Sequence, residues 1–125
     1  MRLPLVPVAA LLDLVCVVAF VVIGRASHNE GNALLGILTT LWPFALALAV
    51  GWAATLAWRD PLRLLPVGAG VWAVTVGGGL LLRVATGQGA PLAFAIVTAL
   101  FLAATLLGWR TIARLARSRS TDAAS

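Results

Sequence analysis

Residues 8–20 read VAALLDLVCVVAF, and they place one carboxyl group, that of Asp13, inside a run that is otherwise apolar from Leu3 to Ile23. A helix needs about 20 predominantly apolar residues to cross the hydrocarbon core of a membrane, and this run has that length. The stretch therefore predicts a membrane-spanning helix that carries an acid within it.

The composition of the whole chain is typical of an integral membrane protein. Of its 125 residues, 62% are hydrophobic and 10% are charged, and the mean hydropathy is +1.04. Soluble domains have about 45–50% apolar and about 25% charged residues. The net charge of +5 comes from arginines that lie between or after the apolar runs. They indicate membrane topology, and we predict no nucleic-acid partner.

Three further runs are long and apolar enough to span a membrane. The predicted spans are residues 3–23, 33–58, 64–82 and 91–109, and short connections rich in turn and breaker residues separate them. Residues 110–125 form a polar tail, which we predict to be cytoplasmic. We therefore predict the all-α fold class: a single membrane domain, residues 1–125, folded as a bundle of four transmembrane helices.

The arginines predict the orientation of these helices. Arg25 and Arg83 fall on one side of the membrane, and the other seven fall together on the opposite side: Arg2, Arg59, Arg63, Arg110, Arg114, Arg117 and Arg119. Because positive charge is retained in the cytoplasm, both termini are predicted to be cytoplasmic. Trp58 and Trp109 lie at the cytoplasmic ends of their spans, where they suit interfacial anchoring. The tail arginines would face anionic lipid headgroups.

A cleaved signal peptide over residues 1 to about 26 is an alternative interpretation of the first run. Its apolar stretch is longer than the usual core of about 7–15 residues, and it contains Asp13, so the spanning helix is favoured.

Small residues spaced by four predict how the helices pack, because in lipid close backbone approach drives association. Such stripes occur on three spans: Ala45, Ala49 and Ala53; Ala69, Ala73 and Gly77; Ala95, Ala99 and Ala103. The cluster Gly77, Gly78 and Gly79 indicates tight backbone contact or a deliberately weak turn. Pro43 removes one backbone hydrogen bond, which frees a carbonyl near Thr39 and predicts a kink, either a static bend or a hinge.

Asp13 lies about eleven residues into a span of about twenty, so we expect it near the middle of the membrane. A carboxylate there costs about 2.5–3.5 kcal/mol. Protonation, hydrogen bonds from neighbouring helices or an arginine partner can each offset this cost. The polar residues predicted to lie at the same depth as Asp13 on the other spans are neutral hydrogen-bonding groups. They are chiefly Trp72 and Thr75 on the third span, with Thr98 on the fourth and Thr40 on the second. A largely protonated Asp13 in a hydrogen-bonded cluster is therefore favoured.

Trp72 and Arg83 share one face of the third span, which leads from mid-membrane to the outer surface. Arg83, Arg25 and His28 would then shape a positively biased entrance above Asp13. The predicted proton- or solute-binding site comprises Asp13, Trp72, Thr75, Arg83, Arg25 and His28. The alternative is that these charges only solvate the outer helix ends, while Asp13 is a buried packing residue.

No residues form a catalytic or metal-binding pattern. One histidine and one cysteine cannot form an ordinary zinc site. Ser27 and His28 are adjacent without nucleophile–base geometry, and no G-x-S-x-G elbow occurs. We therefore predict no catalytic residue, no metal, no cofactor and no enzymatic activity.

Five segments resemble a known family. They are LLDLVCVVAF at residues 11–20, GRASH at 24–28, TLWPF at 40–44, VWAVTVGGGLLLR at 71–83 and GWR at 108–110. Over about residues 11 to 110 the chain is similar to small bacterial membrane proteins known as domain of unknown function 3054. The resemblance implies a four-helix protein of the bacterial cytoplasmic membrane and supplies no activity. The family's characteristic positions would be Asp13, Arg25, His28, Trp42, Pro43, Trp72, Thr75 and Arg83.

Two functional hypotheses follow. In the first, the protein is transporter-like, and Asp13 binds a proton or a small solute. Small multidrug-resistance transporters are similar in having four spans and an acid within the first, but their helical motifs differ. In the second, the protein is a noncatalytic accessory or structural subunit of a larger membrane complex. Since four helices enclose only a narrow cavity, we expect as partners the lipid bilayer and either a second copy or a larger complex.

Overall fold

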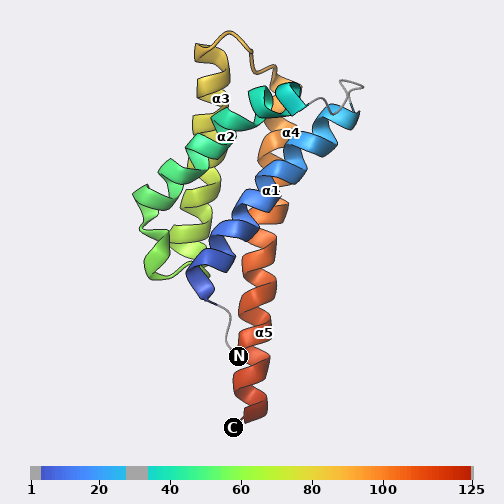
Figure 1. The fold of residues 1–125 in the computed structure, drawn as a ribbon. Helices are drawn as coiled ribbons and strands as arrows, with labels where there is room; N and C mark the ends of the chain where they lie inside the picture. Colours follow the sequence, from blue (N-terminus) through green and yellow to red (C-terminus); the bar gives the residue numbers. More distant parts are fainter. Residues whose placement is uncertain (1–3, 28–33, 125) are drawn as a thin grey trace.

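The computed structural model describes residues 4–27 and 34–124, and it is helical throughout its regular structure. The long helices are α1 (Leu5–Ser27), α2 (Leu34–Thr55), α3 (Ala69–Ala85) and α4 (Leu92–Leu102), which continues through the π-helical segment η3 (Ala103–Leu107) into α5 (Gly108–Ala124). Two short elements, η1 (Ala57–Arg59) and η2 (Leu64–Gly68), lie between α2 and α3. Both termini lie at the same end of the bundle, which we call the termini end (Figure 1). The predicted all-α fold class is confirmed.

Four helical stretches are long and apolar enough to cross a membrane: Leu5–Ala26, Leu34–Thr55, Leu64–Ala85 and Leu92–Arg119. The first three agree with the predicted spans to within a few residues. The fourth differs, because the helix does not end at residue 109 but continues through α5 to Ala124. Much of the polar tail is therefore an extension of the fourth helix, and α5 projects beyond the other helices at the bottom of Figure 1. These helices indicate a multi-pass membrane protein.

Glycines bring α2 and α3 into close contact. A Cβ added to Gly78 would lie 3.0 Å from the Cβ of Ala47, and one added to Gly79 would overlap the ring of Phe44. Gly78 and Gly79 thus lie in tight contact with side chains of α2, which agrees with the first of the two interpretations of the glycine cluster. Gly77 makes no such contact within the bundle: it is exposed, and among the described residues a Cβ there would have no neighbour within 4 Å. The physical reason is the rotation of about 100° per residue, which turns Gly77 away from the face that Gly78 occupies.

Pro43 is buried within α2, which remains one helix from Leu34 to Thr55. The Thr39 carbonyl, which has no backbone donor at position 43, accepts a hydrogen bond of 3.3 Å from Nε2 of Gln88 in the α3–α4 connection. The freed carbonyl predicted near Thr39 is therefore capped by a side chain. Hinge motion at Pro43 stays a prediction.

All four phenylalanines of the chain pack together between α1, α2 and α4. The Phe20 ring centroid lies 5.5 Å from that of Phe44, 6.0 Å from that of Phe94 and 5.6 Å from that of Phe101. This aromatic cluster fills the bundle from its middle toward the end opposite the termini. The helices are held together at the termini end by a different kind of contact.

Candidate functional site

Asp13 lies on the inward face of α1, where Ala9, Asp13 and Val17 recur every four residues and have no exposed surface. It follows the first residue of α1 by eight positions and precedes the last by fourteen, or about 12 Å and about 21 Å along the axis. Asp13 thus lies three residues, or about 4.5 Å, from the middle of α1 toward the termini end, and its depth in the membrane stays a prediction. The helix continues four residues past the predicted end at residue 23, so Asp13 lies closer to the termini end.

The carboxylate of Asp13 forms a buried ion pair with Arg110 of α5. Nη1 of Arg110 donates to Oδ1 at 2.8 Å, and Nη2 donates to Oδ2 at 2.7 Å. Both side chains are 0% exposed. Two parallel bonds between a planar guanidinium and a carboxylate are the strongest geometry that this pair can adopt.

Two tryptophans complete the shell around the carboxylate. Nε1 of Trp109 donates to Oδ1 at 2.8 Å, and Nε1 of Trp52 in α2 donates to Oδ2 at 2.7 Å. Each oxygen of Asp13 thus accepts two hydrogen bonds, one from an indole and one from the guanidinium. An ionised carboxylate has about four acceptor positions, so its hydrogen-bonding capacity is filled.

Arg110 also binds the backbone around it. Its Nε donates to the Pro61 carbonyl at 2.8 Å, and its Nη1 donates to the Leu106 carbonyl at 3.1 Å. The guanidinium carbon lies 4.6 Å from the centroid of the Trp109 ring. Pro61 and Leu62 are themselves buried, so the α2–α3 connection covers the ion pair on the termini side.

The fourth helix carries Arg110 inward through a run of buried residues spaced by four: Thr98, Leu102, Leu106 and Arg110. In a regular α-helix each step of four overshoots a full turn by about 40°, so three steps drift by about 120°. The π-helical turn η3 lies inside this run. Its hydrogen bonds reach one residue further, so the turn is wider and absorbs part of the drift. Arg110 is thereby kept on the inner face.

This arrangement binds four parts of the chain together: α1 through Asp13, α2 through Trp52, the α2–α3 connection through Pro61, and the fourth helix through Arg110. Removing one partner of a buried ion pair costs about 3–5 kcal/mol, because the other charge is left uncompensated. The site is thus suited to fixing the helices, and the carboxylate has no unfilled position for a solute.

The partners predicted for Asp13 are wrong. Nε1 of Trp72 donates instead to the Ala99 carbonyl of α4 at 2.9 Å. The Thr75 hydroxyl is buried and has no hydrogen-bond partner among the described residues. The neutral cluster expected around a protonated acid is replaced by the ion pair with Arg110. Arg110 was missed because the fourth span was expected to end at residue 109, whereas the helix continues past it and carries Arg110 to Asp13.

Two of the predicted entrance residues, Arg25 and Arg83, lie at the other end of the bundle. Nη1 of Arg25 donates to Oγ1 of Thr40 at 3.2 Å. Nε of Arg83 donates to the Gly89 carbonyl at 3.0 Å, and its guanidinium carbon lies 4.4 Å from the centroid of the Phe94 ring. His28 lies outside the described residues. An entrance formed by Arg25, Arg83 and His28 stays a prediction.

The family model described as "Protein of unknown function (DUF3054)" matches residues 10–113, which is most of the chain. The chain belongs to the DUF3054 family. The matched region includes both Asp13 and Arg110. No curated protein and no solved structure matches the chain. The description of DUF3054 names no activity.

Three residues of the site in this DUF3054 chain were missed from the sequence: Trp52, Trp109 and Arg110. The sequence predicted Arg110 to lie in the tail and face lipid headgroups, which is wrong, since Arg110 is fully buried. Interfacial anchoring by Trp109 stays a prediction; the sequence did not predict that this half-buried residue binds Asp13. The available signal was the segment GWR at 108–110, which places an arginine and an indole directly after an apolar run.

Proposed function

We propose that this DUF3054 protein is a noncatalytic structural subunit of a larger membrane complex, in which Asp13 holds the bundle together. The observation that carries the proposal is the filled shell of Asp13: four donated hydrogen bonds, an arginine partner and no exposed surface. A site that binds and releases a solute needs an acceptor position that opens to it. Asp13 is better suited to permanent helix contact.

The outward face of α3 supports a partner in the membrane. Gly77 is exposed, has free space around its Cα, and follows the exposed Ala73 by one helical turn. Small residues at this spacing allow the backbone of a second helix to approach closely in lipid. The partner is then another membrane helix, from a second copy or from a larger complex. In this function the protein is not an enzyme and uses no cofactor, metal or nucleic acid.

The test is the mass of the particle purified in mild detergent. Gly77→Leu places a large side chain on the outward face of α3. We expect it to dissociate the partner and lower the mass of the particle to that of one chain. Gly24→Leu is the matched control, because a Cβ at Gly24 also has no neighbour within 4 Å in the described part of the chain, but Gly24 lies on α1. If Gly77→Leu and the parent purify with the same mass, this surface does not hold a partner.

The transporter-like function is the second candidate, and the observation that favours it is the ionisable group itself, since such residues inside membrane spans commonly serve ion or proton pathways. In that function Arg110 would release Asp13, which would then bind a proton or small solute admitted past Arg25, Arg83 and His28. Liposomes that hold the full chain distinguish the two functions. Proton or solute flux that Asp13→Asn abolishes, with the fold retained, would establish transport, whereas flux equal to that of empty liposomes supports the structural function.

The proposed location is the cytoplasmic membrane of a bacterium, with the termini end inside the cell. The clustering of seven arginines toward that end supports this orientation.

A further inference from the structure

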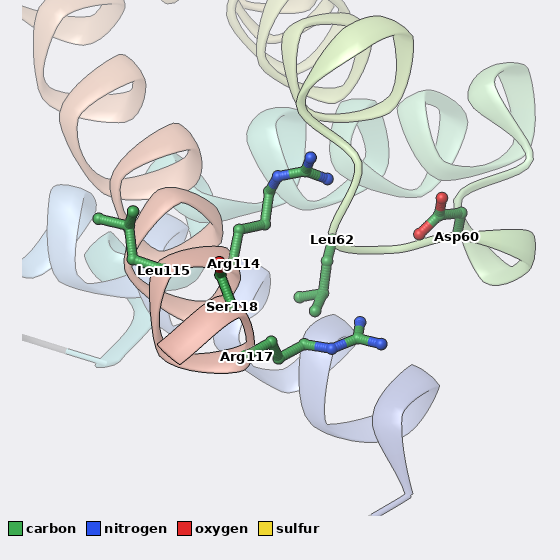
Figure 2. Close-up of a pocket in the computed structure, with 6 residues that line it drawn as sticks. All are labelled: Asp60, Leu62, Arg114, Leu115, Arg117 and Ser118. Carbon is green, nitrogen blue, oxygen red and sulfur yellow. The ribbon is translucent and has the colours of Figure 1, made fainter. Parts of the chain in front are cut away.

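A groove lies between α5 and the α2–α3 connection, outside the Asp13 site. It has a volume of about 520 Å³, and its lining residues are Asp60, Leu62, Arg114, Leu115, Arg117 and Ser118. Figure 2 shows the side chains of Arg114 and Arg117 extending from α5 toward the side on which Asp60 lies, with Leu62 between them. Two guanidinium groups therefore border one hollow.

A second hollow of about 390 Å³ adjoins the first, because it shares Asp60 and Arg114 and adds Arg63, Leu64 and Leu65. The combined groove carries three arginines and one aspartate, which gives it a net charge of +2. Its charge selects an anionic ligand, and its single carboxylate provides one hydrogen-bond acceptor beside the cations.

The groove lies at the level where the membrane spans end. The second span ends at Thr55 and the third begins at Leu64, so the connection that lines the groove follows one span and precedes the next. Beside it, Leu65 is 72% exposed and Trp58 is 48% exposed. Exposed apolar and indole groups at the ends of spans are typical of the membrane–water interface. Charged and apolar surfaces thus meet at the depth of lipid headgroups.

We propose that this groove binds the headgroup of an anionic phospholipid that also carries hydroxyl groups, such as phosphatidylglycerol. The phosphodiester accepts hydrogen bonds from Arg114 and Arg117, since guanidinium groups match phosphate oxygens in pairs. A headgroup hydroxyl donates to the Asp60 carboxylate, which would repel a second phosphate oxygen. The acyl chains pass over Leu64 and Leu65 into the bilayer.

A lipid fits this groove better than a free phosphate does, because the arginines are bordered by apolar side chains. Leu65 and Leu115 are both exposed next to the charged residues. A small hydrophilic anion would leave these apolar side chains uncovered, whereas a lipid covers them with its acyl chains. Basic pockets of this kind between membrane helices recognise acidic headgroups.

The test is retention of lipid by the full chain. The protein is reconstituted in phosphatidylcholine vesicles that contain a small fraction of spin-labelled phosphatidylglycerol or, in a parallel arm, spin-labelled phosphatidylmethanol. Both lipids are phosphodiesters of equal charge, and only the first has headgroup hydroxyls. We expect preferential association of both over phosphatidylcholine, with phosphatidylglycerol bound more tightly. Arg114→Gln with Arg117→Gln should weaken the association about fivefold for each arginine removed.

Arg119→Gln is the matched control, because Arg119 is exposed on the same helix but does not line the groove, and it should leave association unchanged. Asp60→Ala should remove the preference for phosphatidylglycerol over phosphatidylmethanol. An equal loss in the Arg119 variant, or the same association in the double variant as in the parent, would overturn the proposal. So would displacement of the lipid by millimolar inorganic phosphate, which would identify the groove as a site for a free anion.

Discussion

Asp13 and Arg110 place two opposite charges inside a helical bundle, and each is tolerated there because the other is present. Burial removes the hydration of both groups, and the bidentate contact with its surrounding donors replaces that hydration. The net stability gained from such a pair can be small, while the penalty for breaking it is large. The pair therefore specifies one arrangement of α1 against the fourth helix.

Each single replacement in this pair should be strongly destabilising, and the two losses should not add in the double variant. Asp13→Asn and Arg110→Gln should each lower the free energy of unfolding by about 3–5 kcal/mol, because each leaves a buried charge without its partner. The double variant should lose clearly less than the two losses combined. Unfolding in mixed detergent micelles, followed by circular dichroism, measures all three. Additive losses would show that the two side chains do not interact.

The indole donors can be tested separately from the charges. Trp52→Phe keeps an aromatic ring but removes the N–H that donates to Oδ2 of Asp13, and a hydrogen bond to a charged group contributes about 1.5–3 kcal/mol. We expect a loss of stability of that size in the same unfolding assay. Trp58→Phe is the control, since Trp58 is exposed and should change stability by less than about 0.5 kcal/mol. Similar effects for both variants would contradict a special role for Trp52.

For single residues, the sequence predicted that Asp13 needs a partner but not which residue the partner is. An acid in an apolar run has to be compensated, and that inference held for Asp13. Choosing the partner required the relative positions of residues on different helices. Because the fourth span was predicted to end at residue 109, Arg110 was assigned to the tail, and the expected partners were Trp72 and Thr75. Partner choice is a long-range property that hydropathy does not encode.

Among the helices, α2 and α3 form the closest pair, because glycines on both remove the side chains that would separate them. Besides Gly78 and Gly79 on α3, Gly51 on α2 contributes, since a Cβ there would lie 3.3 Å from the Cα of Val71. A shared face of small residues allows backbones to approach in lipid. The contact depends on which glycine faces the partner helix.

Adjacent glycines on α3 provide a matched test of this packing. Gly79→Ala places a methyl group against the Phe44 ring and should lower stability by about 1–3 kcal/mol despite the better helix propensity of alanine. Gly77→Ala, which meets no neighbour, should be neutral or raise stability by up to about 1 kcal/mol. Detergent unfolding of the two variants decides the matter. Equal changes in stability for the two variants would mean that α3 is rotated from the orientation in this structure.

Hydropathy predicted the number of helices and most of their ends, because a span is defined by a local run of apolar residues. It failed at the fourth helix for a physical reason. The residues after 109 are polar, which marks the end of the apolar run but not the end of the helix. The π-helical turn η3 also leaves no signal in the apolar pattern, although it helps to orient Arg110.

The whole molecule has two ends of different chemistry. The end opposite the termini is filled by the aromatic cluster and carries Arg25 and Arg83, whereas the termini end is closed by the Asp13–Arg110 pair and the buried α2–α3 connection. One of the seven arginines predicted to set the orientation, Arg110, is buried inside the bundle. Among the described residues, five other arginines lie at the termini end against two at the other, so the bias used by the positive-inside rule persists.

Orientation in the membrane can be measured with single cysteines in a Cys16→Ser background, since Cys16 is the one native cysteine. Thr86→Cys lies in the α3–α4 connection, and Ala116→Cys lies on α5 beyond the ion pair; both positions are exposed. A maleimide that cannot cross membranes, added to intact cells, should label Thr86→Cys at once. It should label Ala116→Cys only after the membrane is permeabilised, because the arginine-rich termini end is held in the cytoplasm. Labelling of both cysteines in intact cells would instead mean that the chain inserts in two orientations. A reversed pattern would place the arginine-rich end outside the cell. Either result would contradict the charge argument for cytoplasmic termini.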